Sequence, residues 1–314
     1  MLKKALFIDF KEGDTPAPYF NRIRRLFRTI KFVQRNDKGI AKELLDTDAI
    51  FCKISTRIDK EIFDSAPSLK YVGVQSTAFD AIDAKYARSK KVAVCNLGGY
   101  STEAVAEFAI AVMFEQAREL ERAKNKARKY DFGFADFMGK DLRGRSLGVI
   151  GAGKIGSRIA ELGLGIGMKV FYFSRSRNPA LEKLGAKKKT IDAILTGCEF
   201  ITLGLALNKG TEGILNKKRI NSIKNGSTLI SLTPPKLLNN EAVLKRTDKG
   251  EITFIFDHSD DVDLALAKRY LKSKGAVVYP PVAFRTEEAN TNRFETFAAN
   301  IENFVKGKPQ NVVN

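Results

Sequence analysis

The sequence predicts an α/β protein of two domains, each built on a parallel sheet. Its 314 residues exceed what a single hydrophobic core usually organises. Short apolar runs of strand length alternate with helix-length segments along the whole chain, which is the pattern of parallel α/β sheets. A glycine-rich turn at 151–156 follows one of these runs and begins a second series of alternating segments. Together these observations predict two sheets.

The first series supplies five candidate strands, and a long helix follows it. The strands are expected at 5–10, 30–34, 49–54, 71–75 and 92–95. Gly98 and Gly99 then interrupt the pattern, and Ser101 can cap the next helix. That helix carries Val105, Phe108, Val112 and Leu120 at helical spacing, and it is long enough to bridge two domains.

The second series extends from the middle of the chain almost to its end. Its strands are expected at 147–150, 170–173, 200–207, 228–232, 252–257 and 276–279. A closing helix shows Phe294, Phe297, Ile301 and Phe304 on one face. Because this helix can return to the first sheet, we expect one domain of residues 1–99 with 285–314 and a second of residues 100–284.

The glycine-rich turn has the spacing of a dinucleotide site. Gly151 allows a tight turn, Gly153 lets the backbone approach a pyrophosphate, and Gly156 lets the following helix pack close to the strand. The free N–H groups and positive dipole end of that helix favour phosphate binding. We therefore expect contacts along the whole turn, from Gly151, Ala152, Gly153, Lys154, Ile155 and Gly156. A glycine-rich turn of an unrelated α/β unit is the alternative.

The end of the second strand of this unit favours NADP(H) over NAD(H). An NAD site places an acidic residue there to accept a hydrogen bond from the ribose 2′-hydroxyl. Here the segment reads Ser174, Arg175, Ser176 and Arg177, eighteen residues and more beyond Gly156. A hydroxyl and a guanidinium would bind a 2′-phosphate, which a carboxylate would repel. The alternative is that both arginines are ordinary solvated charges.

Composition excludes several classes of protein. The formal net charge of +18 would concentrate anionic cofactors and substrates, whereas the scattered lysines make nucleic acid an unlikely partner. No apolar run is long enough to cross a membrane, and the first residues indicate a strand rather than a signal peptide. Cys52, Cys95 and Cys198 lie far apart in apolar runs, so we expect buried thiols, no metal site and a cytoplasmic location.

Several motifs together resemble the D-isomer-specific 2-hydroxyacid dehydrogenase family. Residues 96–107 (NLGGYSTEAVAE) are similar to its entry into an interdomain helix, and residues 142–153 (LRGRSLGVIGAG) to its cofactor motif. Residues 69–83 and 300–314 resemble further segments of the family. The resemblance implies two Rossmann-like domains, the first discontinuous and flavodoxin-like, and a homodimer formed through the cofactor domain and the apolar face of residues 105–120. The FSRS ending at 173–176 resembles NADPH-using members.

The resemblance fails at the catalytic positions. Family members use an Arg to clamp a 2-keto acid, a His to donate a proton to the developing alkoxide, and a Glu to hold the His. The Arg position matches Pro234 or Pro235 here, and the His position matches Val282. The segment after Asp257 has no equivalent Glu-Pro. The usual mechanism therefore does not carry over residue by residue.

The resemblance does extend to the cofactor and substrate positions. Thr102 and Thr233 match positions that border the phosphates and the nicotinamide ring, and Asp257 matches the acceptor for the carboxamide. In the first domain, Ser76, Thr77 and Ala78 match a loop whose backbone N–H groups hold the substrate carboxylate, and Lys53 and Ser55 match a neighbouring substrate loop. A small anionic substrate is thus expected.

Four residues are candidates to replace the missing catalytic groups: Lys236, Arg285, Tyr279 and Tyr100. His258 is the only histidine, and strand alternation predicts that it points away from Asp257. We interpret the chain as an NADP(H)-dependent oxidoreductase that reduces a small keto acid or other carbonyl compound with a different set of catalytic groups. The alternative is a catalytically silent NADP(H)-binding protein, a sensor or binding partner on the same fold.

Overall fold

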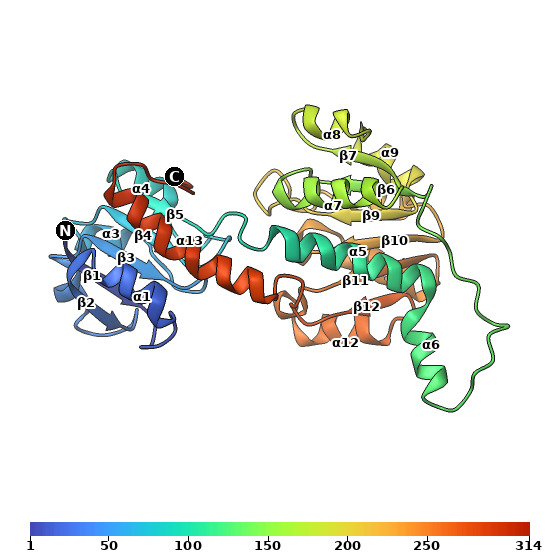
Figure 1. The fold of residues 1–314 in the computed structure, drawn as a ribbon, viewed down its shortest axis with the longest axis horizontal. Coiled ribbons are helices and arrows are strands. Elements are labelled where there is room, and N and C mark those ends of the chain that lie inside the picture. The colour runs from blue at the N-terminus through green and yellow to red at the C-terminus, as the bar shows by residue number, and fades with distance from the viewer. The chain divides into compact units, whose positions relative to one another are not determined.

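The computed structural model describes residues 1–314 and divides the chain into two compact units. Unit 1 combines Met1–Ser101 with Thr286–Asn314, and unit 2 is Thr102–Arg285. In Figure 1 the blue and red ends of the chain make unit 1, and the green-to-orange middle makes unit 2.

Unit 1 contains a five-stranded parallel sheet. Its strands are β1 (Leu2–Ile8), β2 (Phe27–Val33), β3 (Ala49–Cys52), β4 (Tyr71–Val74) and β5 (Ala93–Cys95). The order across the sheet is β2-β1-β3-β4-β5, and every pairing is parallel. This order is that of flavodoxin-like sheets, which confirms the predicted fold class of the unit.

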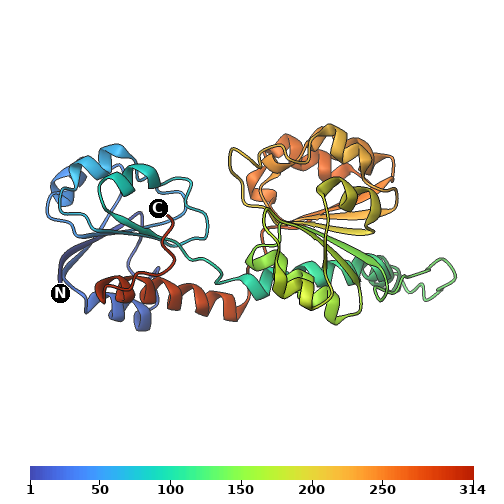
Figure 2. The ribbon, with the colours of Figure 1, turned by 90° about the horizontal axis from the view of Figure 1, so that it is seen from above.

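Helices cover both faces of the sheet of unit 1, as Figure 2 shows. They are α1 (Ala17–Arg24), α2 (Ile40–Leu44), α3 (Lys60–Ser65), α4 (Ala84–Ser89) and α13 (Glu287–Val305). Helix α13 buries Phe297 and Ile301 in the same core cluster as the β1 side chain Phe7. The last residues add backbone hydrogen bonds, among them Val313 N–H to the Val94 carbonyl at 2.9 Å. The predicted return of the closing helix to the first sheet is therefore present.

Unit 2 contains a seven-stranded parallel sheet. Its strands are β6 (Ser146–Ile150), β7 (Lys169–Phe173), β8 (Lys187–Lys188), β9 (Phe200–Leu203), β10 (Ser227–Ser231), β11 (Ile252–Phe256) and β12 (Ala276–Val278). The order is β12-β11-β10-β9-β6-β7-β8. Because β6 is the first strand of the unit, this is the doubly wound Rossmann order with one strand added. Such sheets bind ligands beyond the carboxyl ends of their strands.

The helices of unit 2 form two layers, one on each face of the sheet (Figure 2). They are α5 (Thr102–Arg118), α6 (Leu120–Ala127), α7 (Lys154–Gly165), α8 (Pro179–Lys183), α9 (Ile191–Gly197), α10 (Lys217–Ser222), α11 (Asn240–Asp248) and α12 (Leu264–Lys272). Short 3₁₀ helices occupy Pro235–Leu237 and Ser259–Asp261. No helix of the structure is both long enough and apolar enough to span a bilayer.

The helix predicted to continue through Leu120 ends earlier. Glu119 has a left-handed backbone (φ 50°), which ends α5 at Arg118 and lets α6 begin in a new direction. Part of the apolar face of α5 packs inside unit 2, because Ala106, Val112 and Met113 are buried in the core of that unit. Phe114 of the same helix and Leu120 beyond its end are exposed.

Candidate functional site

The glycine-rich turn connects β6 to α7 at the carboxyl edge of the sheet in unit 2. Gly151 has a φ of 108°, a conformation that residues with a side chain rarely adopt. The N–H groups of Gly151 and Ala152 donate to the Phe173 carbonyl at 2.9 and 3.2 Å, so the turn is tied to the end of β7. A Cβ at Gly151 would lie 2.8 Å from backbone atoms of Gly204, directly after β9. The turn is therefore closely packed on two sides.

Gly156 is closely packed, whereas Gly153 borders open space. A Cβ at Gly156 would lie 1.9 Å from the Gly151 carbonyl oxygen, so only glycine permits the observed approach of α7 to the turn. A Cβ at Gly153 would have no heavy atom within 4 Å, and this residue is exposed. The turn thus has open space at the glycine where a pyrophosphate is expected, which fits a dinucleotide.

Helix α7 presents its N-terminus beside this open space. It begins at Lys154, which is exposed, while Ala152 and Ile155 pack against the core of unit 2. Gly153, the residue before the helix, has an extended backbone and no side chain, so the first N–H groups of α7 are not capped by it. A phosphate is the kind of group that such a helix end binds.

The end of β7 carries one arginine that is paired and one that is not. Arg177 binds Glu182 of α8 through Nε and Nη2, the latter at 2.6 Å, and this contact raises the pKa of the arginine. Ser174 Oγ donates to the Ser176 carbonyl, so the segment is a compact turn. Arg175 is exposed, and no carboxylate forms an ion pair with it. Lys188 lies beside it, since its Nζ donates to the Arg175 carbonyl.

Two further cofactor candidates lie at the ends of β10 and β11. Thr233 is buried next to Ser231 in the turn after β10. Asp257 directly follows β11 and is only 3% exposed, and its Oδ2 accepts from the Ala283 N–H at 3.2 Å. Its Oδ1 is buried without a hydrogen-bond partner. Burial raises the pKa of this carboxyl, and His258 opposes the shift. A buried acceptor without a donor is the feature expected of a ligand contact.

The prediction for His258 is wrong. Its Nε2 lies 3.8 Å from Asp257 Oδ1, and its Nδ1 lies 3.3 Å from Asp261 Oδ2. Strand alternation does not apply, because β11 ends at Phe256 and the chain turns into the 3₁₀ helix Ser259–Asp261. The histidine is therefore held between two carboxylates.

The positions matched to the catalytic groups lie on the same edge of unit 2. Pro235 begins the 3₁₀ helix after β10 and is buried, whereas Lys236 beside it is exposed. Val282 is 40% exposed, and its neighbour Ala283 is the residue bonded to Asp257. Arg285 is also exposed, and its N–H donates to the Val282 carbonyl. The side chain at 282 is apolar and has no proton to exchange.

Tyr279 is a poor candidate for a proton donor. Its hydroxyl donates to Glu115 of α5 at 2.6 Å, and its ring packs edge-on against Phe108. Burial and the hydrogen bond to Glu115 raise the pKa of this hydroxyl well above its usual value. Both features assign Tyr279 to packing between α5 and the end of β12. Tyr100, of unit 1, is half-buried against the core of that unit.

The substrate loop expected in unit 1 follows β4. Asn96 Nδ2 donates to the Thr77 carbonyl at 2.7 Å, and Thr77 Oγ1 donates to the Leu97 carbonyl at 3.0 Å. Ser76 Oγ accepts from the Ala78 N–H, so that backbone donor is already used. Lys53 is paired with Asp14 at 2.7 Å, and Ser55 is exposed. Two of the predicted groups, the Ala78 N–H and the Lys53 ammonium, thus have internal partners.

The sequence analysis missed Gln75 and Arg293. Arg293 Nη2 donates to Gln75 Oε1 at 2.6 Å, although 218 positions separate the two residues in the chain. Arg293 lies on α13, and Gln75 directly follows β4. No local pattern could have indicated this contact, because it depends on the return of α13 to unit 1.

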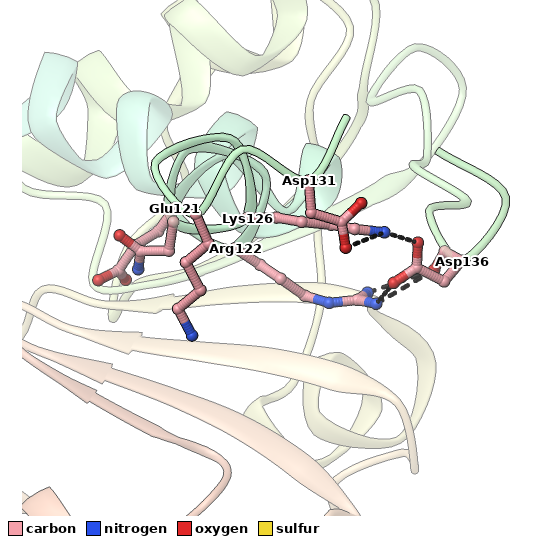
Figure 3. Close-up of a pocket in the computed structure, with 7 residues that line it drawn as sticks. Glu121, Arg122, Lys126, Asp131 and Asp136 are labelled. Atoms are coloured by element: carbon pink, nitrogen blue, oxygen red, sulfur yellow. Dashed lines mark hydrogen bonds and ion pairs between the residues drawn. The ribbon is translucent and has the colours of Figure 1, made fainter. Parts of the chain in front are cut away.

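A hollow of about 660 Å³ on α6 contains none of the candidate cofactor or substrate residues (Figure 3). Its charges neutralise one another: Asp136 accepts from Arg122 at 2.6 Å and from Lys126 at 2.7 Å, and Lys126 lies 3.6 Å from Asp131. It is open to solvent, and none of its lining residues belongs to the glycine-rich turn. The ion pairs fasten the 128–141 segment to α6.

The close approach of α7 to the turn yields a test with a control on the same helix. Gly156→Ala places a methyl group against the Gly151 carbonyl, and we expect a loss of about 1–3 kcal/mol in stability and of dinucleotide binding. Gly165→Ala adds the same methyl group in open space and should be neutral or stabilising. Urea unfolding and a cofactor titration measure both. Equal behaviour of the two variants would contradict this account of the turn.

Comparisons with known proteins agree with this geometry. Residues 110–283 match the family model described as D-isomer specific 2-hydroxyacid dehydrogenase, NAD binding domain. A glyoxylate reductase of Thermococcus kodakarensis is 30% identical over 284 residues, which cover 88% of this chain and 85% of the relative. A hydroxypyruvate reductase of Blautia hydrogenotrophica is 27% identical over 276 residues, with 86% and 85% covered.

Two solved structures extend the likeness to the whole chain. The D-lactate dehydrogenase of Aquifex aeolicus, complexed with NAD and lactic acid, has a TM-score of 0.83 at 25% identity and covers 97% of this chain and 96% of its own. The acyclic imino acid reductase Bsp5, in complex with NADPH and D-Arg, has a TM-score of 0.86 at 25% identity, with 100% of both chains covered. The chain therefore belongs to the D-isomer specific 2-hydroxyacid dehydrogenase family of NAD(P)-dependent oxidoreductases, which act on CH–OH groups.

Proposed function

We propose that this protein is an NADP(H)-dependent oxidoreductase that reduces a small keto acid or other carbonyl compound with catalytic groups other than the usual Arg, Glu and His. The observation that carries the choice of cofactor is the end of β7, where Ser174 and Arg175 occupy the place of an acidic residue. When bound, NADPH would supply the hydride. The turn from Gly151 to Gly156, Thr102, Thr233 and Asp257 would hold the cofactor.

Arg175 is the residue best placed to bind a 2′-phosphate. Its guanidinium is exposed and has no acidic partner, whereas that of Arg177 is engaged by Glu182. Lys188 adds a second positive charge close to the same turn. A planar guanidinium matches the geometry of a phosphate and can bind two of its oxygens. Glu182, the nearby acid, is turned to Arg177 and Tyr172 and is not free to accept from a ribose hydroxyl.

Replacement of Arg175 should therefore change the cofactor preference. Arg175→Asp should weaken NADPH binding about ten- to hundredfold, since a charge-assisted hydrogen bond contributes about 1.5–3 kcal/mol, and should leave NADH binding equal or tighter. Arg177→Gln serves as the control, because its charge is already compensated, and it should change NADPH affinity only slightly. Fluorescence titration with both cofactors measures the effect. A wild-type protein that binds NADH more tightly than NADPH would contradict the proposal.

The group at position 282 limits the reaction on ordinary keto acids. Hydride addition to a ketone creates an alkoxide, and a positioned acid typically contributes 10²–10⁴-fold to the rate by protonating it. Val282 cannot supply a proton, and neither Pro234 nor Pro235 can bind a carboxylate electrostatically. Lys236 and Arg285 are exposed cations on the same edge of unit 2 and remain the candidates to replace these groups there.

A protonated C=N compound is a second candidate substrate, and the apolar Val282 is the observation that favours it. When hydride adds to the carbon of a protonated imine, the electron pair of the double bond moves to nitrogen, which already carries its proton. The amine forms without an acid in the protein. The imino acid reductase with a similar structure was solved with NADPH and D-Arg, which supports this substrate class for a chain of this shape.

A substrate panel distinguishes these possibilities. With glyoxylate, pyruvate or hydroxypyruvate alone, we expect NADPH oxidation at about 0.1 per second or less, at least about a hundredfold below a typical enzyme rate of about 10 per second. Added ammonium or methylamine, which forms the imine in solution, should raise the rate if C=N reduction is the function. Val282→His alone should not restore keto-acid reduction, because the Arg and Glu positions also differ. Brisk turnover of pyruvate by the wild type would contradict the assignment of the catalytic positions.

No turnover with either panel, together with tight NADPH binding, would favour the silent binding protein instead. The cofactor titration is therefore part of the same experiment. It also shows that each variant is folded, because the residues expected to hold the cofactor do not include position 282.

We also propose that the protein is a homodimer formed through the 128–141 segment of unit 2. This segment exposes Tyr130, Phe132, Phe134 and Met138, an unusual concentration of large apolar side chains on a surface. The ion pairs of Asp136 hold it to α6 (Figure 3), so it can present these side chains in a fixed arrangement. We propose a second copy of the chain as its partner, because the family resemblance implies a homodimer formed through this domain.

Sedimentation at micromolar concentration should show a dimer for the wild type and monomers for a Phe132→Ser, Phe134→Ser double variant. Leu264→Ser removes another exposed apolar side chain, from α12, and should leave the dimer intact. A wild-type protein that sediments only as a monomer would contradict the proposal.

The free thiols support a reducing, cytoplasmic location. Cys52, Cys95 and Cys198 are all buried and unpaired. Burial raises the pKa of Cys95 and of Cys198 to about 11, so these thiols are poorly reactive and fit a structural role in a compartment where thiols stay reduced.

A further inference from the structure

Arg293 lies at the carboxyl edge of the sheet in unit 1, where the proposed function leaves it unexplained. Its Nη2 donates to Gln75 Oε1 at 2.6 Å, and its guanidinium carbon lies 5.4 Å from the centre of the Phe294 ring. Phe294 in turn stacks on Tyr19 of α1. The guanidinium is thus positioned by a hydrogen bond and by packing, while the residue remains partly exposed.

The charge of Arg293 is not compensated within the protein. Its hydrogen-bond partner is a neutral amide, and no carboxylate forms an ion pair with it. Arg22 offers a comparison in the same unit: its guanidinium binds Glu295 at 2.6 Å and Glu302 at 2.7 Å, both on α13. Two further cations at this edge have acidic partners, since Lys53 is paired with Asp14 and Arg35 with Asp59. Arg293 is therefore a positioned cation of this edge whose charge remains available to an anion.

Gln75 shows a second feature that points to a ligand. The residue is only 7% exposed, and its Nε2 is buried without a hydrogen-bond partner. A buried donor left unsatisfied costs about 1–3 kcal/mol, so its retention calls for an acceptor that the chain alone does not provide. Since its Oε1 accepts from Arg293, the two donors belong to one cluster.

The backbone beyond Gln75 supplies further donors. Leu97 N–H donates to the Ser76 carbonyl at 2.9 Å, and Asn96 holds the Thr77 carbonyl, so the loop is fixed before any ligand binds. The Ala78 N–H is used by Ser76 Oγ, but no hydrogen bond is formed by the N–H groups of Ser76 and Thr77. Gln75, which binds Arg293, directly precedes Ser76 in the chain, so the guanidinium and these backbone donors belong to neighbouring parts of unit 1.

We propose that Arg293, positioned by Gln75, is a carboxylate-binding residue of unit 1. It would act beside the loop at Ser76 and Thr77, whose backbone N–H groups the family resemblance already implies for the substrate carboxylate. The guanidinium binds one or both oxygens of a substrate carboxylate, and the loop N–H groups bind the oxygen that remains. Arg293 thereby supplies the positive charge that the family resemblance expects at Pro234 or Pro235. The inference rests on the proposed function in one respect, namely that the substrate is a small carboxylic acid.

The test uses the full-length protein and oxalate, a stable dicarboxylate that needs no turnover. Calorimetric titration, with and without saturating NADPH, should show oxalate binding by the wild type. Arg293→Met should weaken it about ten- to hundredfold, the usual effect of removing a charge-assisted contact. Arg293→Lys should fall between the two, because it keeps the charge and loses the planar fork. Arg28→Met, which removes an exposed arginine from β2, should bind like the wild type.

Several outcomes would overturn the inference. These are no oxalate binding by the wild type, unchanged binding by Arg293→Met, or tighter binding of inorganic phosphate than of oxalate. NADPH affinity, measured on the same samples, should be the same in all variants because the glycine-rich turn lies in unit 2. Oxalate binding without NADPH binding would support the carboxylate site and contradict the proposed function. The failure of one can therefore be distinguished from the failure of the other.

Discussion

The contact between α7 and the glycine-rich turn is the constraint on which the cofactor half of this structure depends. With a Cβ at Gly156 only 1.9 Å from the Gly151 carbonyl oxygen, no other residue allows the helix to begin where it does. That beginning puts the first N–H groups of α7 beside the open space at Gly153. The bonds from Gly151 and Ala152 to the Phe173 carbonyl then bring the end of β7, with Arg175, to the same place.

The parallel arrangement of the strands explains why the other candidate site residues of each unit lie at one edge of its sheet. In each unit the carboxyl ends of the strands meet at one edge, so Asp257 and Val282 lie at one edge in unit 2 and Lys53 and Gln75 at one edge in unit 1. The groups that would hold the cofactor do not include the positions where the family places its proton donor and its arginine. On this proposal, different residues of the chain hold the cofactor and act on the substrate.

Local sequence was sufficient for most elements and for the turn, but it did not predict the short edge strand β8 (Lys187–Lys188). The glycine spacing at 151–156, the alternating apolar runs and the helical stripe of Phe294, Phe297, Ile301 and Phe304 all report interactions between residues close in the chain, and the structure contains each element. The end of α5 was missed because it depends on the left-handed backbone of Glu119, a residue whose type does not favour it.

Contacts between distant residues could not be predicted in this way. Glu182 neutralises Arg177 from the next helix, which only the turn at Asn178 makes possible. His258 faces Asp257 because β11 ends one residue earlier than the alternation assumed. Arg293 meets Gln75 because α13 crosses back to the sheet of unit 1. In all three cases the interaction partner is determined by tertiary packing, which the local sequence pattern does not report.

A crystal structure of the full chain with NADP⁺ and oxalate tests the central claim most directly. The account predicts the 2′-phosphate on Arg175, the pyrophosphate at the N-terminus of α7, and oxalate on Arg293 with the backbone of Ser76 and Thr77. A 2′-phosphate directed away from Arg175, or oxalate held by unit 2 alone, would contradict the account.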